Sequence, residues 1–271
     1  MIYRVLLADA LLKAGAAAGP VLGLDTGTSS AYLGIVSGGR MLASVAHTAK
    51  SHGSDLPELV EAVMGEAGLK FKDLAGIAVG IGPGSFTGLR VGVSYVKGLA
   101  LAARIKVKGV SSLEAIALCA AGEPSSDNGV TICPVIDARK GEVYTSLYHV
   151  AGDALERRTD DRVVKIELLI TELEGRVVFA GEAKAEEACE HFRKIGGRGE
   201  VVGNARLQLV GGFIAAIGAA RVVEGDIDPI MGLEPRYVRP PDATVKHTAL
   251  KPGEAIHGTT RGRAGPAVCG T

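Results

Sequence analysis

A glycine-rich loop between an expected strand and an expected helix is the feature that most constrains this chain. The stretch from Gly80 to Ala103 reads GIGPGSFTGLRVGVSYVKGLALAA. Apolar and small residues alternate over positions 77–81, as in a buried strand, and apolar residues recur at helical spacing behind the loop. The sequence therefore predicts a strand, a tight loop and a helix whose first turn is capped by Ser85 or Thr87.

Neither common nucleotide-binding motif occurs in this loop. A P-loop requires a lysine followed by Ser or Thr, and Leu89 and Arg90 stand in those places. The dinucleotide motif requires a third glycine where this chain has Ser85 or Thr87. The loop is therefore expected to form a turn without holding a phosphate in either of these ways.

Two glycines inside the following helix point to a close contact. Gly88 and Gly92 lie four residues apart on one helix face, which Val96 continues. Because a glycine inside a helix costs roughly 1 kcal/mol relative to alanine, two at this spacing indicate that another backbone approaches closely. Packing within the same domain and packing against another subunit both explain the pattern.

Composition describes a globular chain without a strong electric field. Of the 271 residues, 47% are hydrophobic and 22% charged, and Lys plus Arg equals Asp plus Glu at 30 each. A balanced charge does not draw the protein to nucleic acid or to an anionic membrane, so any RNA is expected to be held mainly by a partner. No run is expected to span a membrane, and the four cysteines form no Cys-x-x-Cys pair, so reduced thiols in the cytoplasm are expected.

A strand, an aspartate, a turn and a second strand occur twice along the chain. The first copy is Val21–Asp25 with a strand over 31–36, and the second is a strand over 130–136, Asp137 and a strand over 143–150. Chance similarity between short strands is one explanation, and a duplicated domain of two lobes is the other.

The expected domain boundaries follow from this repeat. Residues 1–20 are an N-terminal extension, 21–122 the first lobe, 123–240 the second lobe and 241–271 a flexible tail. A helix near 207–220 is expected within the second lobe, and it could also pack back on the first lobe.

Three stretches closely resemble the signatures of one family. They are the glycine loop, the segment VIDARKGEVY over 135–144 and the segment PRYVR over 235–239. In this order they resemble the TsaB (YeaZ) family of tRNA threonylcarbamoyladenosine biosynthesis proteins. The matching signature residues are Gly82, Pro83, Gly84, Ser85, Phe86, Thr87, Gly88, Arg90, Asp137, Arg139 and Glu142.

The resemblance implies a fold and a role. The fold is α/β, the actin-like ATPase (ribonuclease H-like) fold, with two lobes of mixed sheet and helices. The role is a non-catalytic scaffold that binds and activates a TsaD-like transferase acting on adenosine 37 of tRNA. A TsaE-like ATPase completes the assembly, the isolated protein is expected to form a homodimer, and tRNA is met only through the complex.

The partner surface is expected on helices of the first lobe. In the family such helices pack as a bundle with their counterparts in the partner. The residues carried over are Leu56, Leu59, Val60, Val63, Gly88, Gly92, Val93 and Val96.

A nucleotide site is expected to survive only in half. In this fold, small glycine-rich turns of both lobes face the phosphates with backbone amides. Asp25, Thr26, Gly27 and Thr28 fit such a turn in the first lobe, although a capped strand end explains them as well. In the second lobe the bulky residues over 138–142 would fill the space, so no cofactor is expected.

No catalytic or metal-binding set is expected. The histidines closest in sequence, His47 and His52, are five residues apart, and no His-Glu-x-x-His or nucleophile–base pattern occurs. A metallopeptidase is therefore disfavoured. The alternative from another class is a stand-alone kinase or ATPase of the same fold.

Overall fold

The first of two mixed sheets lies in the N-terminal half of the chain. The computed structural model describes residues 4–6, 19–48, 52–121, 129–152 and 154–239. The first sheet has the order β4-β3-β2-β5-β6, with β2, β5 and β6 parallel and β3 antiparallel to both of its neighbours. Its strands are β2 (Val21–Asp25), β3 (Ser30–Ser37), β4 (Arg40–Thr48), β5 (Gly76–Gly82) and β6 (Lys106–Ser111).

The second sheet repeats this order in the C-terminal half. Along the path β11-β8-β7-β12-β13, β7, β12 and β13 are parallel and β8 is antiparallel to both of its neighbours. The start of β7 also pairs with β9, which continues through β10 to β1. The strands are β1 (Arg4–Leu6), β7 (Val130–Arg139), β8 (Glu142–Thr145), β9 (Tyr148–Ala151), β10 (Ala154–Arg157), β11 (Arg162–Lys165), β12 (Arg176–Gly181) and β13 (Arg198–Val201).

The equal strand order in both sheets explains the repeat in the sequence. In each, a hairpin strand and a third strand flank one side of a central strand, and two parallel strands follow on the other. Two such sheets in one chain are the duplicated arrangement of the actin-like ATPase fold, so the predicted fold class is confirmed.

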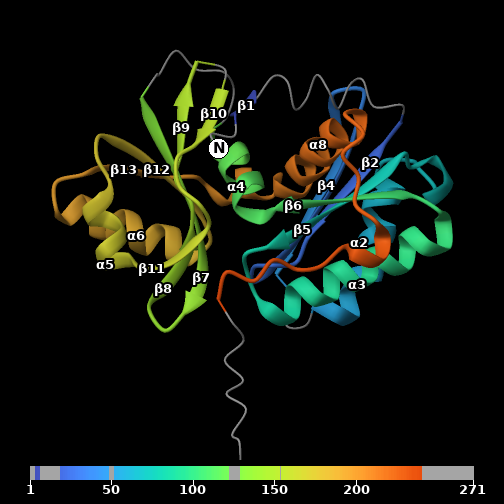
Figure 1. Cartoon of the computed structure of the whole chain (residues 1–271), viewed down its shortest axis with the longest axis horizontal. Coiled ribbons are helices and arrows are strands. Elements are labelled where there is room, and N and C mark those ends of the chain that lie inside the picture. The colour runs from blue at the N-terminus through green and yellow to red at the C-terminus, as the bar shows by residue number, and fades with distance from the viewer. Residues whose placement is uncertain (1–3, 7–18, 49–51, 122–128, 153, 240–271) are drawn as a thin grey trace, which may run out of the picture. The chain divides into compact units, whose positions relative to one another are not determined.

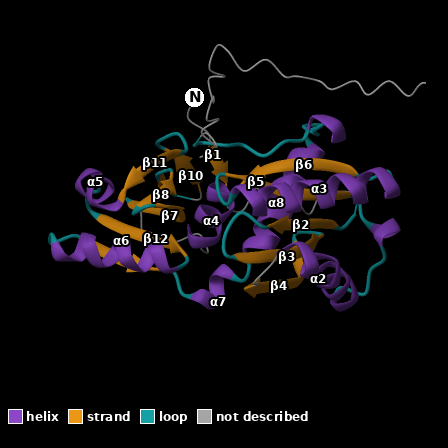
Figure 2. Ribbon diagram, turned by 90° about the horizontal axis from the view of Figure 1, so that it is seen from below, coloured by secondary structure: helices purple, strands orange, loops and turns teal. Residues whose placement is uncertain are grey.

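Helices cover both faces of the sheets (Figure 1). α2 and α3 pack on one face of the first sheet, α4 and α8 lie between the sheets, and α6 packs on the outer face of the second, as Figure 2 also shows. Each interface between layers holds its own cluster of buried apolar side chains. The bounds of the helices are α2 (His52–Glu66), α3 (Phe86–Ala103), α4 (Ser112–Ala121), α5 (Ile166–Leu169), α6 (Ala183–Lys194), α7 (Asn204–Leu207) and α8 (Val210–Val223).

α8 returns to the first lobe and rests directly on its sheet. A Cβ atom at Gly23 of β2 would lie 2.2 Å from the carbonyl oxygen of Gly211, and one at Gly211 would lie 2.3 Å from the backbone of Leu33. Only glycine lets the helix and sheet backbones approach this closely. The helix near 207–220 therefore begins as α7, breaks, and continues as α8 against β2, β3 and β5.

One apolar stretch differs from the expectation that no run is long and apolar enough to span a membrane. Residues 204–223 are long and apolar enough to cross a membrane by length and composition. Most residues of α8 in that stretch are buried on the first sheet and against α4. Its apolar composition is accounted for by this position in the core, where both sides of the helix meet protein.

Several element boundaries differ from the expectation. β7 runs on through Asp137 to Arg139, so the turn predicted over 138–142 is only the tip of a hairpin. The single strand predicted over 143–150 is divided into β8 and β9. Arg4–Leu6, predicted to belong to an N-terminal extension outside the two lobes, pair with β10. The predicted linker over 123–129 and the tail over 241–271 lie almost wholly outside the described residues.

Candidate functional site

The turn after β2 is held by contacts within the first lobe. Asp25 is buried, and its carboxylate accepts a hydrogen bond of 2.6 Å from the amide of Gly27. Gly80 of β5 leaves room for that carboxylate, because a Cβ there would lie 2.0 Å from Asp25 Oδ2. Thr26 donates from its hydroxyl to the carbonyl oxygen of Gly88 over 2.7 Å. Thr28, the fourth predicted nucleotide-binding residue, donates from its hydroxyl to the carbonyl oxygen of Ser30 over 3.0 Å. All four predicted residues are thus engaged in contacts within the lobe.

The exposed end of the same turn binds a carboxylate of the second lobe. Glu182 follows β12 and accepts hydrogen bonds from the amides of Ser29 over 3.1 Å and Ser30 over 3.0 Å. The Ser29 hydroxyl also donates to Glu182, and the Tyr32 hydroxyl lies 3.4 Å from it. Burial alone would raise the pKa of Glu182, but the hydrogen bonds from the two serines lower this pKa below its ordinary value.

The equivalent position of the second lobe is a hairpin. The amide of Arg139 donates to the Asp137 carboxylate over 2.8 Å, and Arg139 and Lys140 both adopt positive φ, at 66° and 56°. Glu142 on the other side of the hairpin pairs with Arg239. Two long basic side chains, those of Arg139 and Lys140, stand at the tip in place of the small residues that a phosphate turn requires.

The glycine loop packs against the turn after β2. The Ser85 amide donates to the carbonyl oxygen of Gly27 over 2.6 Å, and the Ser85 hydroxyl caps α3 by accepting from the Gly88 amide. A Cβ at Gly84 would lie 2.2 Å from that Gly27 oxygen. The glycines of the loop therefore allow contact between two turns of one lobe.

The residues predicted for the partner surface lie on the inward faces of α2 and α3. A Cβ at Gly88 would lie 2.0 Å from the Thr26 carbonyl oxygen, and one at Gly92 would lie 2.3 Å from the Thr26 hydroxyl. These glycines serve packing within the lobe, which was the simpler of the two explanations. Leu59 is half-buried, and the other predicted residues are buried inside the chain, namely Leu56, Val60, Val63, Gly88, Gly92, Val93 and Val96.

The opposite faces of α2 and α3 are exposed and carry small residues. Nothing lies within 4 Å of a Cβ built at Gly65 or Gly98. The Glu61 carboxylate adds to burial in raising the pKa of Tyr95, so the two helices lie side by side here. We name the outer face of α2 and α3 by its exposed residues Glu58, Glu61, Ala62, Gly65, Ser94, Gly98, Leu101 and Ala102.

The three signatures meet in space through their side chains. The rings of Phe86 and Tyr237 stack with centroids 4.8 Å apart. The Arg90 guanidinium lies 4.0 Å from the Phe86 centroid and donates from Nε to the Tyr237 hydroxyl over 2.9 Å. With the Glu142–Arg239 pair, these contacts connect the glycine loop and the β7–β8 hairpin to the C-terminal segment.

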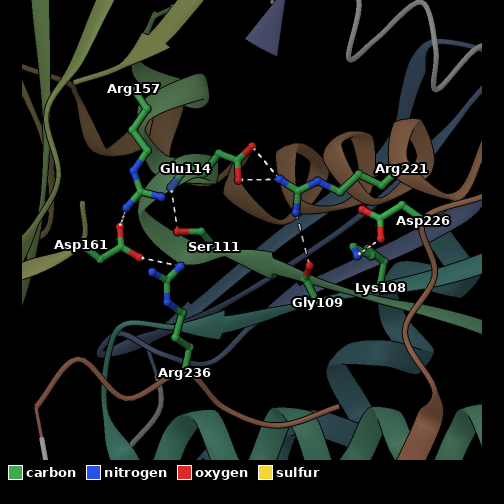
Figure 3. A network of polar contacts seen from close by, with 9 residues as sticks. All are labelled: Lys108, Gly109, Ser111, Glu114, Arg157, Asp161, Arg221, Asp226 and Arg236. Atoms are coloured by element: carbon green, nitrogen blue, oxygen red, sulfur yellow. Dashed lines mark hydrogen bonds and ion pairs between the residues drawn. The ribbon is translucent and has the colours of Figure 1, made fainter. Parts of the chain in front are cut away.

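Charged residues between the lobes were not singled out from the sequence (Figure 3). Arg221 of α8 binds Glu114 of α4 through two hydrogen bonds, and Asp161 lies between Arg157 and Arg236. Glu114 and Arg221 lie 107 positions apart in the sequence and share no local pattern, so only the fold brings them together. Glu182 had a usable signal, since it directly follows a glycine at the carboxyl end of a parallel strand, where ligands of α/β sheets bind.

The described residues contain no group of three His, Cys, Asp or Glu that could hold a metal ion. His47 lies 3.4 Å from Asp55, which makes only a pair. Cys119, Cys133 and Cys189 are buried, and burial raises the pKa of both Cys119 and Cys133 to about 12. These thiols are therefore poor nucleophiles.

Comparisons with known proteins agree on one family. Residues 45–208 match the family model described as TsaD: tRNA N6-adenosine threonylcarbamoyltransferase. The tRNA threonylcarbamoyladenosine biosynthesis protein TsaB of Bacillus subtilis is 28% identical over 230 residues, covering 83% of this chain and 96% of that protein. Its counterpart in Escherichia coli is 34% identical over 128 residues, 47% of this chain and 54% of that protein.

A solved structure adds to this agreement. It is a protein from Pseudomonas aeruginosa described as uncharacterized, with similarity to peptidase YEAZ. The two structures align with a TM-score of 0.64 at 25% identity, over 82% of this chain and 100% of the other. The chain therefore belongs to the TsaD family and, within it, to the TsaB (YeaZ) proteins of tRNA threonylcarbamoyladenosine biosynthesis.

Proposed function

We propose that this chain is a non-catalytic subunit that binds and activates a TsaD-like transferase for modification of adenosine 37 in tRNA. Membership of the TsaB proteins supports the pathway. The observation that carries the non-catalytic role is the state of two turns, the one after β2 and the one between β7 and β8. The amides of Ser29 and Ser30 are already bound by Glu182, and the second turn is a hairpin tipped by Arg139 and Lys140.

The partner binds, in this proposal, to the outer face of α2 and α3. This replaces the buried residues predicted from the sequence with the opposite side of the same helices. Small side chains such as Ala62, Gly65, Ser94 and Gly98 allow helices of a partner to approach closely. The same face would support a homodimer when the partner is absent. A TsaE-like ATPase, tRNA contact only through the complex and a place in the cytoplasm remain parts of the proposal.

The test is co-purification with the TsaD-like subunit of the same genome, followed by reconstituted tRNA modification with and without this chain. Gly98→Arg places a long charged side chain on the outer face, and Gly98→Ala is the matched control because both enter open space. We expect Gly98→Arg to lose the complex and the stimulation of modification, and Gly98→Ala to keep both. A complex of full affinity with Gly98→Arg would contradict the assigned surface.

A separate measurement addresses the alternative of a stand-alone kinase or ATPase. Magnesium-dependent ATP turnover by the purified chain, lost in Asp25→Ala, would contradict the non-catalytic role. Gly92→Leu is unsuitable for testing the interface, because its side chain would collide with Thr26 inside the lobe.

A further inference from the structure

The exposed end of the turn after β2 has the donors of an anion-binding site. Two successive backbone amides, of Ser29 and Ser30, and the Ser29 hydroxyl point at one carboxylate group. Converging amides of this kind bind phosphate or carboxylate oxygens. The Ser30 amide also lies 3.2 Å from the Thr28 hydroxyl, so Ser29 is the residue whose amide depends most on the anion.

The anion in this site comes from the other lobe. Glu182 stands at the carboxyl end of β12, just before α6, and is separated from Ser29 by 153 positions. Each of its carboxylate oxygens is used, since Oε2 accepts from Ser29 and Oε1 accepts from Ser30. The contact therefore joins the turn between β2 and β3 of the first sheet to the end of β12 in the second.

We propose that Glu182 is an internal anion, which occupies the Ser29–Ser30 site, excludes free phosphate from it and ties the second lobe to the first. A phosphate group cannot share the site, because it needs the same donors and has the same sign of charge as the carboxylate. The exclusion of phosphate from the Ser29–Ser30 site does not depend on which partner binds the outer face of α2 and α3.

Amide hydrogen exchange measured by NMR on the full chain tests the contact. Glu182→Ala removes the carboxylate, and Glu186→Ala removes an exposed carboxylate from the first turn of the same helix as a matched control. We expect the Ser29 amide to exchange about tenfold faster in Glu182→Ala, the change expected when a charge-assisted hydrogen bond is lost. Equal exchange rates in the wild type and both variants would overturn the proposal.

A titration with inorganic phosphate, at constant ionic strength, tests the anion site itself. In Glu182→Ala we expect the Ser29 and Ser30 amide resonances to shift and saturate, and in Glu186→Ala and the wild type we expect them to stay in place. Resonances that titrate equally in all three chains would overturn the exclusion. Faster exchange in Glu182→Ala with no shift in phosphate would overturn the assignment as an anion site.

Discussion

Arg221 of α8 binds both carboxylate oxygens of Glu114 in α4, over 2.9 Å and 2.7 Å. Both side chains are largely buried, with 14% and 9% of their surface exposed, and they lie in the layer between the sheets (Figure 3). Removing one partner leaves the other as a buried charge, which costs several kcal/mol.

We therefore expect Arg221→Met to lower the free energy of unfolding by about 3 kcal/mol in chemical denaturation. The double variant Glu114→Leu with Arg221→Met removes both charges and is expected to recover most of that loss, because no unpaired charge remains. A double variant as unstable as the single one would show that packing, and not charge, makes Arg221 important.

The two glycines of α3 that face Thr26 should not tolerate any side chain. We expect Gly88→Ala to lower the free energy of unfolding by about 2 to 3 kcal/mol, because its Cβ would enter the space of the Thr26 carbonyl oxygen. Gly98→Ala in the same helix is the control. It enters open space and should raise stability by roughly 0.5 to 1 kcal/mol. Thermal unfolding of both variants in one buffer checks the difference, and equal effects would contradict it.

Glu182 should make stability depend on pH in the acid range. Its pKa in the folded protein is lower than in the unfolded chain, so its carboxylate stabilises the fold fully above the unfolded value of about 4.3. The stabilisation is lost as pH falls through the folded pKa. The titratable side chain that faces it is Tyr32, whose pKa burial raises, so Tyr32 stays neutral in this range. Denaturation between pH 3 and pH 6 should give a shallower slope for Glu182→Gln than for wild type, and parallel curves would refute this.

Tyr237 should hold the C-terminal segment on the first lobe through its ring more than through its hydroxyl. Tyr237→Phe keeps the stacking on Phe86 and loses the bond from Arg90, whereas Tyr237→Ala loses both. Because stacked rings contribute about 0.5 to 1.5 kcal/mol beyond burial, only Tyr237→Ala is expected to speed proteolysis after residue 225. If Tyr237→Phe and Tyr237→Ala were both cleaved faster than wild type and at the same rate, the hydroxyl and not the ring would hold the segment.

The fold class could be predicted from the sequence because its signals are local. Each signal lies within a few residues of the strand or turn that it predicts. The signals are the alternation within strands, the aspartates at 25 and 137 and the hairpin glycines 38 and 39. The two basic residues of the β7–β8 hairpin, Arg139 and Lys140, could be identified for the same reason, since their size is read directly from the sequence.

The residues predicted for the partner surface lie in the core because helical spacing shows which residues share a face and not what covers that face. In α2 and α3 the sheet covers the apolar face, so Val60 and Val96 lie in the core and the face with the small residues is exposed. The partners of Glu182 and of Arg221 lie 153 and 107 positions away in the sequence, and no local pattern identifies partners at such separations.

The return of α8 to the first sheet has a consequence for synthesis of the chain. The sheet face around Gly23 and Gly34 is completed only by residues 210–223, after nearly all of the second lobe has been translated. Until then one apolar side of β2 and β3 has no cover, although its strands can already pair. Because exposed apolar sheet surface favours aggregation, a ribosome stalled within the second lobe would carry a nascent chain that needs a chaperone on that face.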